Sequence, residues 1–251
     1  MLADRVYIVT GGSAGFGLTI AGHLIAAGAR VGITGRNAER LEKAAEELGE
    51  HCLGLVADVA DSAAVADAFA QVKAHFGRLD GLINNAGLAY PNAVESLVEA
   101  EVVTQINTNF LGTVLCCQAA IPLLRGGDNP RIINVSSASA WHYDEMSHLS
   151  IYAASKAAVE RFSRDLYLEL QADGIGVTCL RPGSAWTTFS EGWDPKAIEK
   201  GFAAWADRGK YMSTGMEIEQ VGDAVVYALS QPPGVAVDLL EVRPNIPTPK
   251  N

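Results

Sequence analysis

One stretch near the N-terminus decides the fold of this chain, VYIVTGGSAGFG at residues 6–17. It begins as an apolar, β-branched run, which is typical of a buried strand. It ends in a turn that carries Gly11, Gly15 and Gly17 and leads into a helical pattern. Glycines let a backbone approach a pyrophosphate closely, and the N-terminus of a helix attracts its charge. The stretch therefore predicts a dinucleotide-binding turn, with a plain strand-to-helix turn as the alternative.

Outward from this stretch, short apolar runs alternate with helical patterns along the chain. Further strands are predicted at 31–34, 53–56, 79–83, 131–135, 176–180 and 235–242, and helices at 18–27, 38–48, 62–76, about 94–124 with a break, 152–170 and about 218–229. Such alternation predicts a Rossmann-type, doubly wound parallel α/β sheet of about seven strands, with helices on both faces. We expect a single domain over 1–251, with the less regular segment 184–215 as a small substrate lid.

Composition narrows the classes of partner. The 251 residues carry a net charge of −10, which argues against binding to nucleic acid or to anionic lipid. No apolar run approaches the ~20 residues needed to span a bilayer, and no signal-peptide pattern opens the chain. The four cysteines form no CxxC pair, and the His and acidic residues near His142 fit no metal-ligand spacing. We therefore expect a cytoplasmic protein with free thiols and no metal site.

The residue after the second strand bears on the cofactor. Proteins that bind NAD commonly place Asp or Glu there, where it accepts a hydrogen bond from a ribose hydroxyl. This chain has Gly35 followed by Arg36. No carboxylate is therefore present there to repel a 2′-phosphate, and a guanidinium is available to bind it. The pattern favours NADP(H) and leaves NAD(H) possible, the alternative being that Arg36 is a solvated residue at a helix start.

A tyrosine and a lysine can share one helix face. Tyr152 and Lys156 are four residues apart, and an ammonium group nearby would lower the tyrosine pKa from ~10 toward neutrality. Tyr152 could then act as a general acid or base. Ser137, at the end of the fifth strand, could orient the reacting oxygen. Ser139, two residues nearer to the tyrosine, is the alternative if the loop 138–151 holds no insertion.

The motifs together resemble those of the short-chain dehydrogenases/reductases over essentially the full length. They are TGxxxGxG at 10–17, NNAG at 84–87, Asn109, the serine pair 136–137, YxxxK at 152–156 and PGxxxT at 182–187. The resemblance implies nicotinamide-dependent oxidation of an alcohol or reduction of a carbonyl.

The resemblance also implies roles for individual residues. The catalytic set would be Asn109, Ser137, Tyr152 and Lys156, with Asn109 kinking its helix and holding a water linked to the lysine. Asp58 and Val59 would meet the adenine, and Thr187 the carboxamide. The implied cofactor contacts are Gly11, Ser13, Gly15, Phe16, Gly17, Arg36, Asp58, Val59, Asn85, Ala86, Gly87, Tyr152, Lys156, Pro182, Gly183 and Thr187.

Aromatic residues gather in the segments expected above the strand ends. The predicted substrate contacts are Ser139, Trp141, Tyr143, Trp186, Phe189 and Trp193. They suggest an apolar pocket that tolerates aromatic carbonyl compounds. The alternative is that these side chains pack on one another or on a neighbouring subunit.

The leading interpretation is an NADP(H)-dependent carbonyl reductase or alcohol dehydrogenase with a small-molecule substrate. An NAD(H)-linked secondary-alcohol dehydrogenase is the second, and a non-catalytic dinucleotide-sensing protein the third. The resemblance further implies a homodimer or homotetramer, formed through the helix of Tyr152 and the helix of Asn109.

Overall fold

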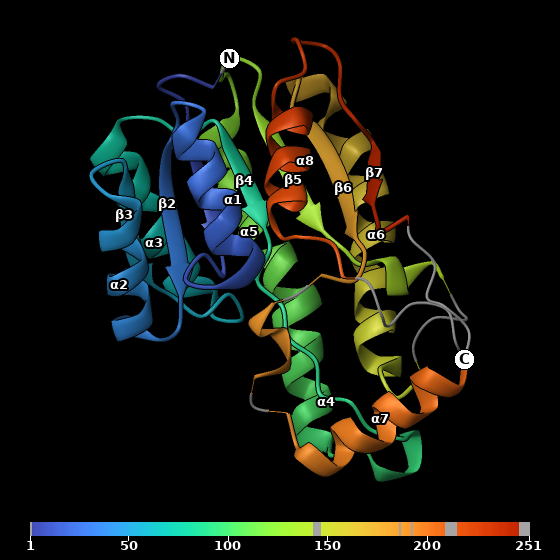
Figure 1. The fold of residues 1–251 in the computed structure, drawn as a ribbon. Coiled ribbons are helices and arrows are strands. Elements are labelled where there is room, and N and C mark those ends of the chain that lie inside the picture. Colours follow the sequence, from blue (N-terminus) through green and yellow to red (C-terminus); the bar gives the residue numbers. More distant parts are fainter. Residues whose placement is uncertain (1, 143–146, 186, 192, 209–214, 246–251) are drawn as a thin grey trace.

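Seven parallel strands lie side by side in one sheet, in the order β3-β2-β1-β4-β5-β6-β7 (Figure 1). This computed structural model describes residues 2–142, 147–185, 187–191, 193–208 and 215–245. The strands are β1 (Val6–Thr10), β2 (Arg30–Gly35), β3 (Cys52–Val56), β4 (Gly81–Asn84), β5 (Arg131–Val135), β6 (Gly176–Pro182) and β7 (Leu239–Val242). The predicted doubly wound α/β domain is confirmed.

The strand order reverses between β1 and β4. The chain runs outward from β1 to β3, and then returns to β4 on the other side of β1. The register aligns Tyr7 with Val31 on one side and with Gly81 on the other. Ligands of open α/β sheets bind at such a reversal, beyond the carboxyl ends of the strands.

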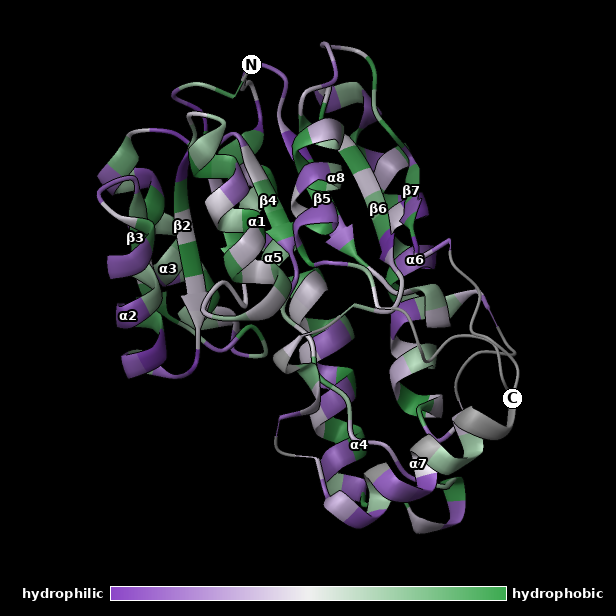
Figure 2. Cartoon of the chain, viewed as in Figure 1, coloured by the Kyte–Doolittle hydropathy of each residue, from purple (hydrophilic) through white to green (hydrophobic). Residues whose placement is uncertain are grey.

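Helices cover both faces of the sheet. The α-helices are α1 (Gly15–Ala26), α2 (Ala38–Leu48), α3 (Ser62–Phe76), α4 (Glu99–Ile106), α5 (Gly112–Leu124), α6 (Ser150–Leu170), α7 (Pro195–Arg208) and α8 (Glu219–Leu229). One core forms between the sheet and α1, α2 and α8, and the other between the sheet and α3, α5 and α6. Figure 2 shows the hydrophobic strands between these layers and hydrophilic residues along the outer side of α2.

Five residues of π-helix, η2 (Asn107–Leu111), join α4 to α5 and supply the predicted break. By length and composition alone, the joined stretch 99–124 could cross a membrane, with a mean hydropathy of 1.2 in its most apolar window. Here α5 packs against α3 and β4, and Gln105, Asn109 and Thr113 are buried polar residues along the stretch. One face of the stretch therefore packs within the domain, and 39% of its apolar window is buried.

The segment 184–215 holds more regular structure than its sequence suggests. Helix α7 lies within it, beyond the carboxyl ends of the strands (Figure 1). The sequence does carry a signal for the start of this helix, which is Asp194 followed by Pro195. In the structure Asp194 Oδ1 accepts a hydrogen bond from Lys196 N (3.0 Å), and Pro195 takes the first helical position. The last strand was predicted too long, since β7 begins only at Leu239.

Candidate active site

The glycine turn follows β1 and is braced by the loop after β4. Gly11 and Gly15 have positive φ angles of 65° and 50°, which favour glycine. Thr10 Oγ1 accepts hydrogen bonds from the backbone N–H groups of Asn85 and Ala86, both at 3.0 Å. The Asn85 side chain donates back to the Thr10 carbonyl (2.9 Å). The expected cofactor residue Asn85 therefore holds the turn in place from behind.

Two other residues of the turn also serve packing. Phe16 packs against the core beneath α1. A Cβ on Gly17 would clash with the Gly11 carbonyl and lie 2.6 Å from Asn85 Nδ2. Only glycine fits at this position, so the turn and α1 can lie close together.

An open cleft of about 640 Å³ lies at the strand reversal. Its lining includes seven of the residues expected to contact a cofactor, Gly11, Ser13, Arg36, Asp58, Val59, Ala86 and Gly87. Gly35, which the sequence analysis placed beside the cofactor ribose, lines it as well. Sequence reasoning missed the other lining residues, which are Thr34, Asn37, Arg40, Ala57, Leu88 and Thr108. Small residues line the cleft at the turn, and positive charge lines it at the β2 end.

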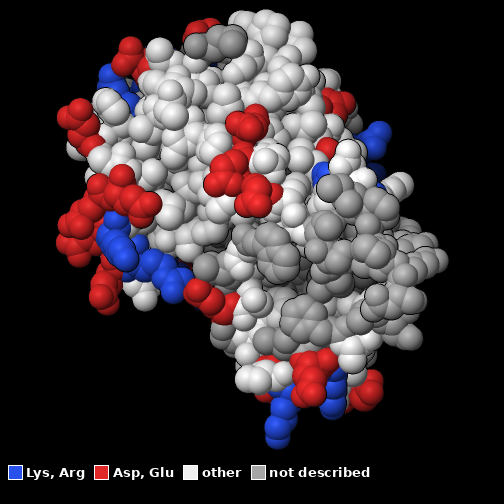
Figure 3. Space-filling model, viewed as in Figure 1, with Lys and Arg blue, Asp and Glu red and all other residues white. Residues whose placement is uncertain are grey.

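That positive charge comes from two arginines. Arg36 follows β2, and Arg40 lies in the first turn of α2, where the Asn37 side chain accepts from its N–H (2.8 Å). Figure 3 shows a row of basic side chains beside α2, next to a group of acidic side chains, leading toward the notch in the outline of the molecule. Arg40 also forms an ion pair with Glu191 (3.2 Å), which joins α2 to the segment before α7.

Ser137 and Tyr152 meet at the carboxyl end of β5. The Ser137 side chain lies close to the Tyr152 hydroxyl and, as a polar partner, opposes the rise of the Tyr152 pKa that burial causes. Ser139 lies behind this pair, and its N–H and hydroxyl both donate to Ser137 Oγ, at 3.2 and 2.9 Å. Of the two serines considered from the sequence, the structure thus brings Ser137 to the tyrosine and makes Ser139 a support for Ser137.

Lys156 lies beneath Tyr152 on α6 and is almost fully buried. Its Nζ donates to the Val135 carbonyl (2.8 Å) and lies 5.9 Å from the centre of the Tyr152 ring. Burial lowers the pKa of Lys156 to about 8. Burial also raises the pKa of Tyr152, so the expected lowering by the ammonium does not dominate here.

Asn109 lies in the π-helical turn and is fully buried. Its side chain accepts from Leu88 N (2.8 Å) and donates to Leu88 O (2.9 Å), so it pairs with that backbone as a strand would. It also reaches Ser155 Oγ (3.0 Å) on α6. A Cβ on Gly87 would lie 3.3 Å from Asn109 Oδ1 and 3.2 Å from Lys156 Nζ, so the two side chains meet at this glycine.

The remaining expected cofactor residues lie at and beyond the end of β6. Pro182 pairs with Val242 of β7, and Gly183 N donates to the Val242 carbonyl (2.8 Å). Thr187 Oγ1 accepts from Phe189 N (3.2 Å) at the start of a short 3₁₀ turn, η5 (Thr188–Ser190). None of these three lines the cleft described above.

The predicted substrate aromatics divide into two groups. Phe189 lies over Tyr152, with ring centres 5.2 Å apart, and Trp193 contacts Phe189 at 5.7 Å. Trp141 points elsewhere, because its exposed ring covers the Arg181 guanidinium at 5.0 Å. Tyr143 and Trp186 lie outside the described residues.

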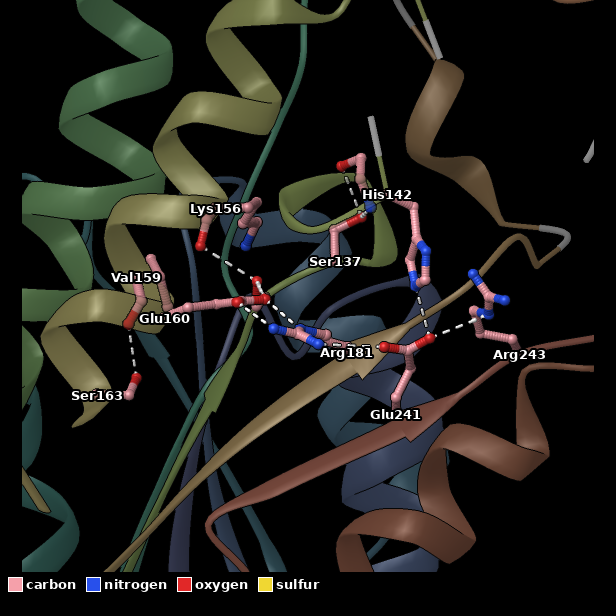
Figure 4. A network of polar contacts seen from close by, with 11 residues as sticks. Ser137, His142, Lys156, Val159, Glu160, Ser163, Arg181, Glu241 and Arg243 are labelled. Atoms are coloured by element: carbon pink, nitrogen blue, oxygen red, sulfur yellow. Dashed lines mark hydrogen bonds and ion pairs between the residues drawn. The ribbon is translucent and has the colours of Figure 1, made fainter. Parts of the chain in front are cut away.

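A buried ionic network, which sequence reasoning missed, adjoins the site (Figure 4). Arg181 of β6 binds Glu160 of α6 and Glu241 of β7. Two signals point to it: an arginine inside an apolar strand, and a glutamate one helical turn after Lys156. Among the described residues no three His, Cys, Asp or Glu side chains gather as a metal site would need, and the four cysteines are free thiols.

Comparisons with known proteins agree with this geometry. The family model for short chain dehydrogenase matches residues 5–197. An uncharacterised oxidoreductase of Staphylococcus epidermidis is 32% identical over 241 residues, which cover 96% of this chain and 97% of that protein.

Two solved structures resemble the fold closely. The closed form of a serine dehydrogenase complexed with NADP+ is 30% identical, with a TM-score of 0.83, and covers 96% of this chain and 95% of that one. The 3-ketoacyl-(acyl-carrier-protein) reductase of Brucella melitensis complexed with NADH is 26% identical, with a TM-score of 0.86 and coverage of 97% and 98%. Family match, relatives and fold together place this chain in the short-chain dehydrogenase family of oxidoreductases.

Proposed function

We propose that this protein is an NADP(H)-dependent oxidoreductase that reduces a carbonyl compound to an alcohol or catalyses the reverse. The observation that carries the proposal is that the Ser137 side chain lies close to the Tyr152 hydroxyl, with the buried Lys156 Nζ 5.9 Å from the centre of the tyrosine ring. A proton donor, an orienting hydroxyl and a buried cation then meet beyond the strand ends, where open α/β sheets bind ligands.

Each side chain has a distinct task in this proposal. Tyr152 gives a proton to the carbonyl oxygen or takes it from the alcohol, and Ser137 donates a hydrogen bond that fixes this oxygen. Lys156 stabilises the phenolate that forms and binds the nicotinamide ribose hydroxyls. Asn109 holds α4 and α5 against the loop after β4, and so fixes the wall beside Lys156. The nicotinamide, when bound, supplies or accepts the hydride.

The choice of cofactor rests on the β2 end of the cleft. Arg36 and Arg40 line it, and Gly35 takes the place where a carboxylate would bind a ribose hydroxyl. A guanidinium suits the planar, bidentate recognition of a phosphate. The serine dehydrogenase complexed with NADP+ supports this preference, and the reductase complexed with NADH keeps NAD(H) as the alternative.

The substrate side is proposed to accept aromatic carbonyl compounds. Phe189 covers Tyr152, Trp193 contacts Phe189, and Trp193 packs against an apolar cluster that includes Trp205. This cluster fixes part of the segment 184–215, which we propose to act as a lid. The lid is tied down by the Trp205 Nε1 hydrogen bond to the Ser147 carbonyl (2.6 Å) and by the Ala185–Met216 bridge.

We also propose that the protein acts as a homodimer or homotetramer. Val103 and Leu111 on the α4–α5 stretch are 49% and 39% exposed, and Leu168 on α6 is 61% exposed. Apolar side chains of this size on two neighbouring helices suit burial against a second copy of the chain.

The deciding experiment is a substrate panel run with both cofactors. Aryl ketones, aliphatic ketones and small 2-oxo acids are offered with NADPH or NADH, and the matching alcohols with NADP+ or NAD+. The proposal predicts the highest kcat/KM for aryl ketones with NADPH. A preference for small acids would overturn the aromatic pocket. A preference for NADH would overturn the cofactor assignment. Cofactor binding without any turnover would favour a dinucleotide sensor.

A further inference from the structure

We infer that Arg181 is a positioning residue of the active site, which holds the turn that carries Ser137 at both of its ends. The turn spans residues 136–142 and includes the short 3₁₀ turn η3 (Ala138–Ala140). This inference rests on the proposed function, because it matters for catalysis only if Ser137 contacts the substrate. Figure 4 shows the network, which lies between α6, β6, β7 and this turn.

The first step is the charge on Arg181 itself. The residue is 8% exposed, and a guanidinium that leaves water needs partners for its fixed fork of donors. Nε and Nη2 each donate to one oxygen of Glu160, both at 2.6 Å, and Nη1 donates to Glu241 (3.2 Å). The Trp141 ring covers the guanidinium from the side of the turn. One buried cation thus joins two carboxylates that would otherwise repel each other.

The first carboxylate fixes the beginning of the turn. Glu160 lies one helical turn after Lys156, on the same face of α6. Its Oε1 accepts a hydrogen bond from Ser136 Oγ (2.9 Å), and the same hydroxyl lies 3.1 Å from the Lys156 carbonyl oxygen. Ser136 directly precedes Ser137, the serine that faces Tyr152. The contacts of Ser136 therefore fix the backbone just before Ser137 against α6, the helix that carries Tyr152.

The second carboxylate fixes the end of the turn. Glu241 lies opposite Arg181 in the β6–β7 pair, and its Oε1 is 2.8 Å from His142 Nε2. His142 N in turn donates to the Ala138 carbonyl (3.0 Å), so the turn closes on itself. The stacked Trp141 adds a third contact at this end. Both ends of the turn therefore meet at the partners of Arg181.

The consequence concerns the position of the Ser137 oxygen. A hydroxyl that must donate to a reacting oxygen works only over a narrow range of distance, and an error of ~1 Å can cost about 100-fold in rate. Without Arg181, Glu160 would lose its cation and would need water or a proton, and Glu241 would keep Arg243 (3.0 Å) and His142 as partners. The turn between them would then be free to shift, although no group that touches the substrate had changed.

The test is a double-mutant cycle between Arg181→Met and Ser137→Ala, with NADPH and the carbonyl compound that the wild-type chain reduces fastest in the panel. Arg181→Met should lower kcat by about 10- to 100-fold and leave the Kd for NADPH within about twofold. In the Ser137→Ala background the same change should alter kcat by less than about twofold, because the hydroxyl that Arg181 positions is absent from that variant. Arg161→Met, which breaks an exposed ion pair with Asp165 on α6, is the control and should leave kcat unchanged.

A loss of kcat that is equally large in both backgrounds would overturn the inference, since Arg181 would then act independently of Ser137. An unchanged kcat in folded Arg181→Met would overturn it too. Where that variant fails to fold, His142→Leu replaces it in the cycle, because it removes the hydrogen bond to Glu241 and leaves the Glu160 end of the network in place.

A measurement without substrate separates this inference from the proposed function. Amide hydrogen exchange of 139–142 reports the N–H groups that close the turn, and it should become at least about tenfold faster in Arg181→Met or His142→Leu. Unchanged exchange would contradict the anchoring, whether or not the wild-type chain turns over a carbonyl compound. Absence of wild-type turnover with faster exchange in the variants would count only against the proposed function.

Discussion

Lys156→Met is expected to make the protein more stable at pH 7 while it removes activity. The wild-type chain buries an ammonium group, and its pKa falls from 10.5 to about 8. This difference corresponds to about 3 kcal/mol that folding loses to desolvation. Methionine is similar in length and avoids this cost, but it leaves the Val135 carbonyl without its hydrogen bond, a loss of about 1 kcal/mol. The net expected gain in the free energy of unfolding is about 2 kcal/mol.

The pH dependence gives the sharper test of this reasoning. Below pH 8 the lysine is charged in both the folded and the unfolded chain, and the folded chain bears the full cost of burial. Between pH 8 and 10.5 the folded chain loses the proton first, so this cost disappears from the wild-type protein. The advantage of Lys156→Met should therefore shrink as pH rises through this window.

Urea unfolding of both proteins from pH 7 to 10.5 measures the difference. Ionisation of the cysteines and tyrosines away from Lys156 affects both proteins alike and cancels. Cys179 does interact with the Lys156 charge, but burial raises the pKa of its thiol to about 12, above this pH range. Lys43→Met removes an exposed lysine on α2 and serves as the control. A stability difference that stays constant over this pH range would refute the burial argument, and a variant less stable than wild type at pH 7 would refute the magnitude.

Three other predictions concern the proposed site. Ser137→Ala should lower kcat by about 10²- to 10³-fold, and Ser139→Ala by much less, because Ser139 only supports Ser137; steady-state rates that reverse this order would reassign the serine. Arg36→Ala should weaken NADPH binding by about 10- to 100-fold and hardly alter NADH binding, and equal losses in a fluorescence titration would count against the phosphate contact. Gly87→Ala should weaken binding of both cofactors, because its Cβ would lie 3.2 Å from Lys156 Nζ; unchanged affinity would show that the loop gives way easily.

Much of the fold could be predicted because its boundaries carry local signals. Helices α2 and α3 begin and end at the predicted residues. Asn37 and Asp61 cap their N-termini with side-chain hydrogen bonds, and Gly49 and Gly77 follow their last turns with positive φ angles. These are short-range interactions, so the sequence of a dozen residues is enough to specify them.

The parts that escaped prediction depend on distant contacts. Arg181, Glu160 and Glu241 lie 21 and 60 residues apart, and only the pairing of β6 with β7 and α6 brings them together. The rise in the Tyr152 pKa likewise follows from burial among several elements, whereas the sequence displayed only its spacing to Lys156. The sequence motifs were therefore enough to locate the site, whereas the pKa of Tyr152 and the partners of Arg181 depend on tertiary packing.

The central claim is that Tyr152 transfers the proton. Tyr152→Phe removes only the hydroxyl and keeps the ring that lies against Phe189. The decisive measurement compares kcat and the Kd for NADPH in wild type and variant, at saturating carbonyl substrate. The proposal predicts a kcat lower by about 10²- to 10⁴-fold with NADPH binding retained. Turnover near the wild-type rate in Tyr152→Phe would contradict it.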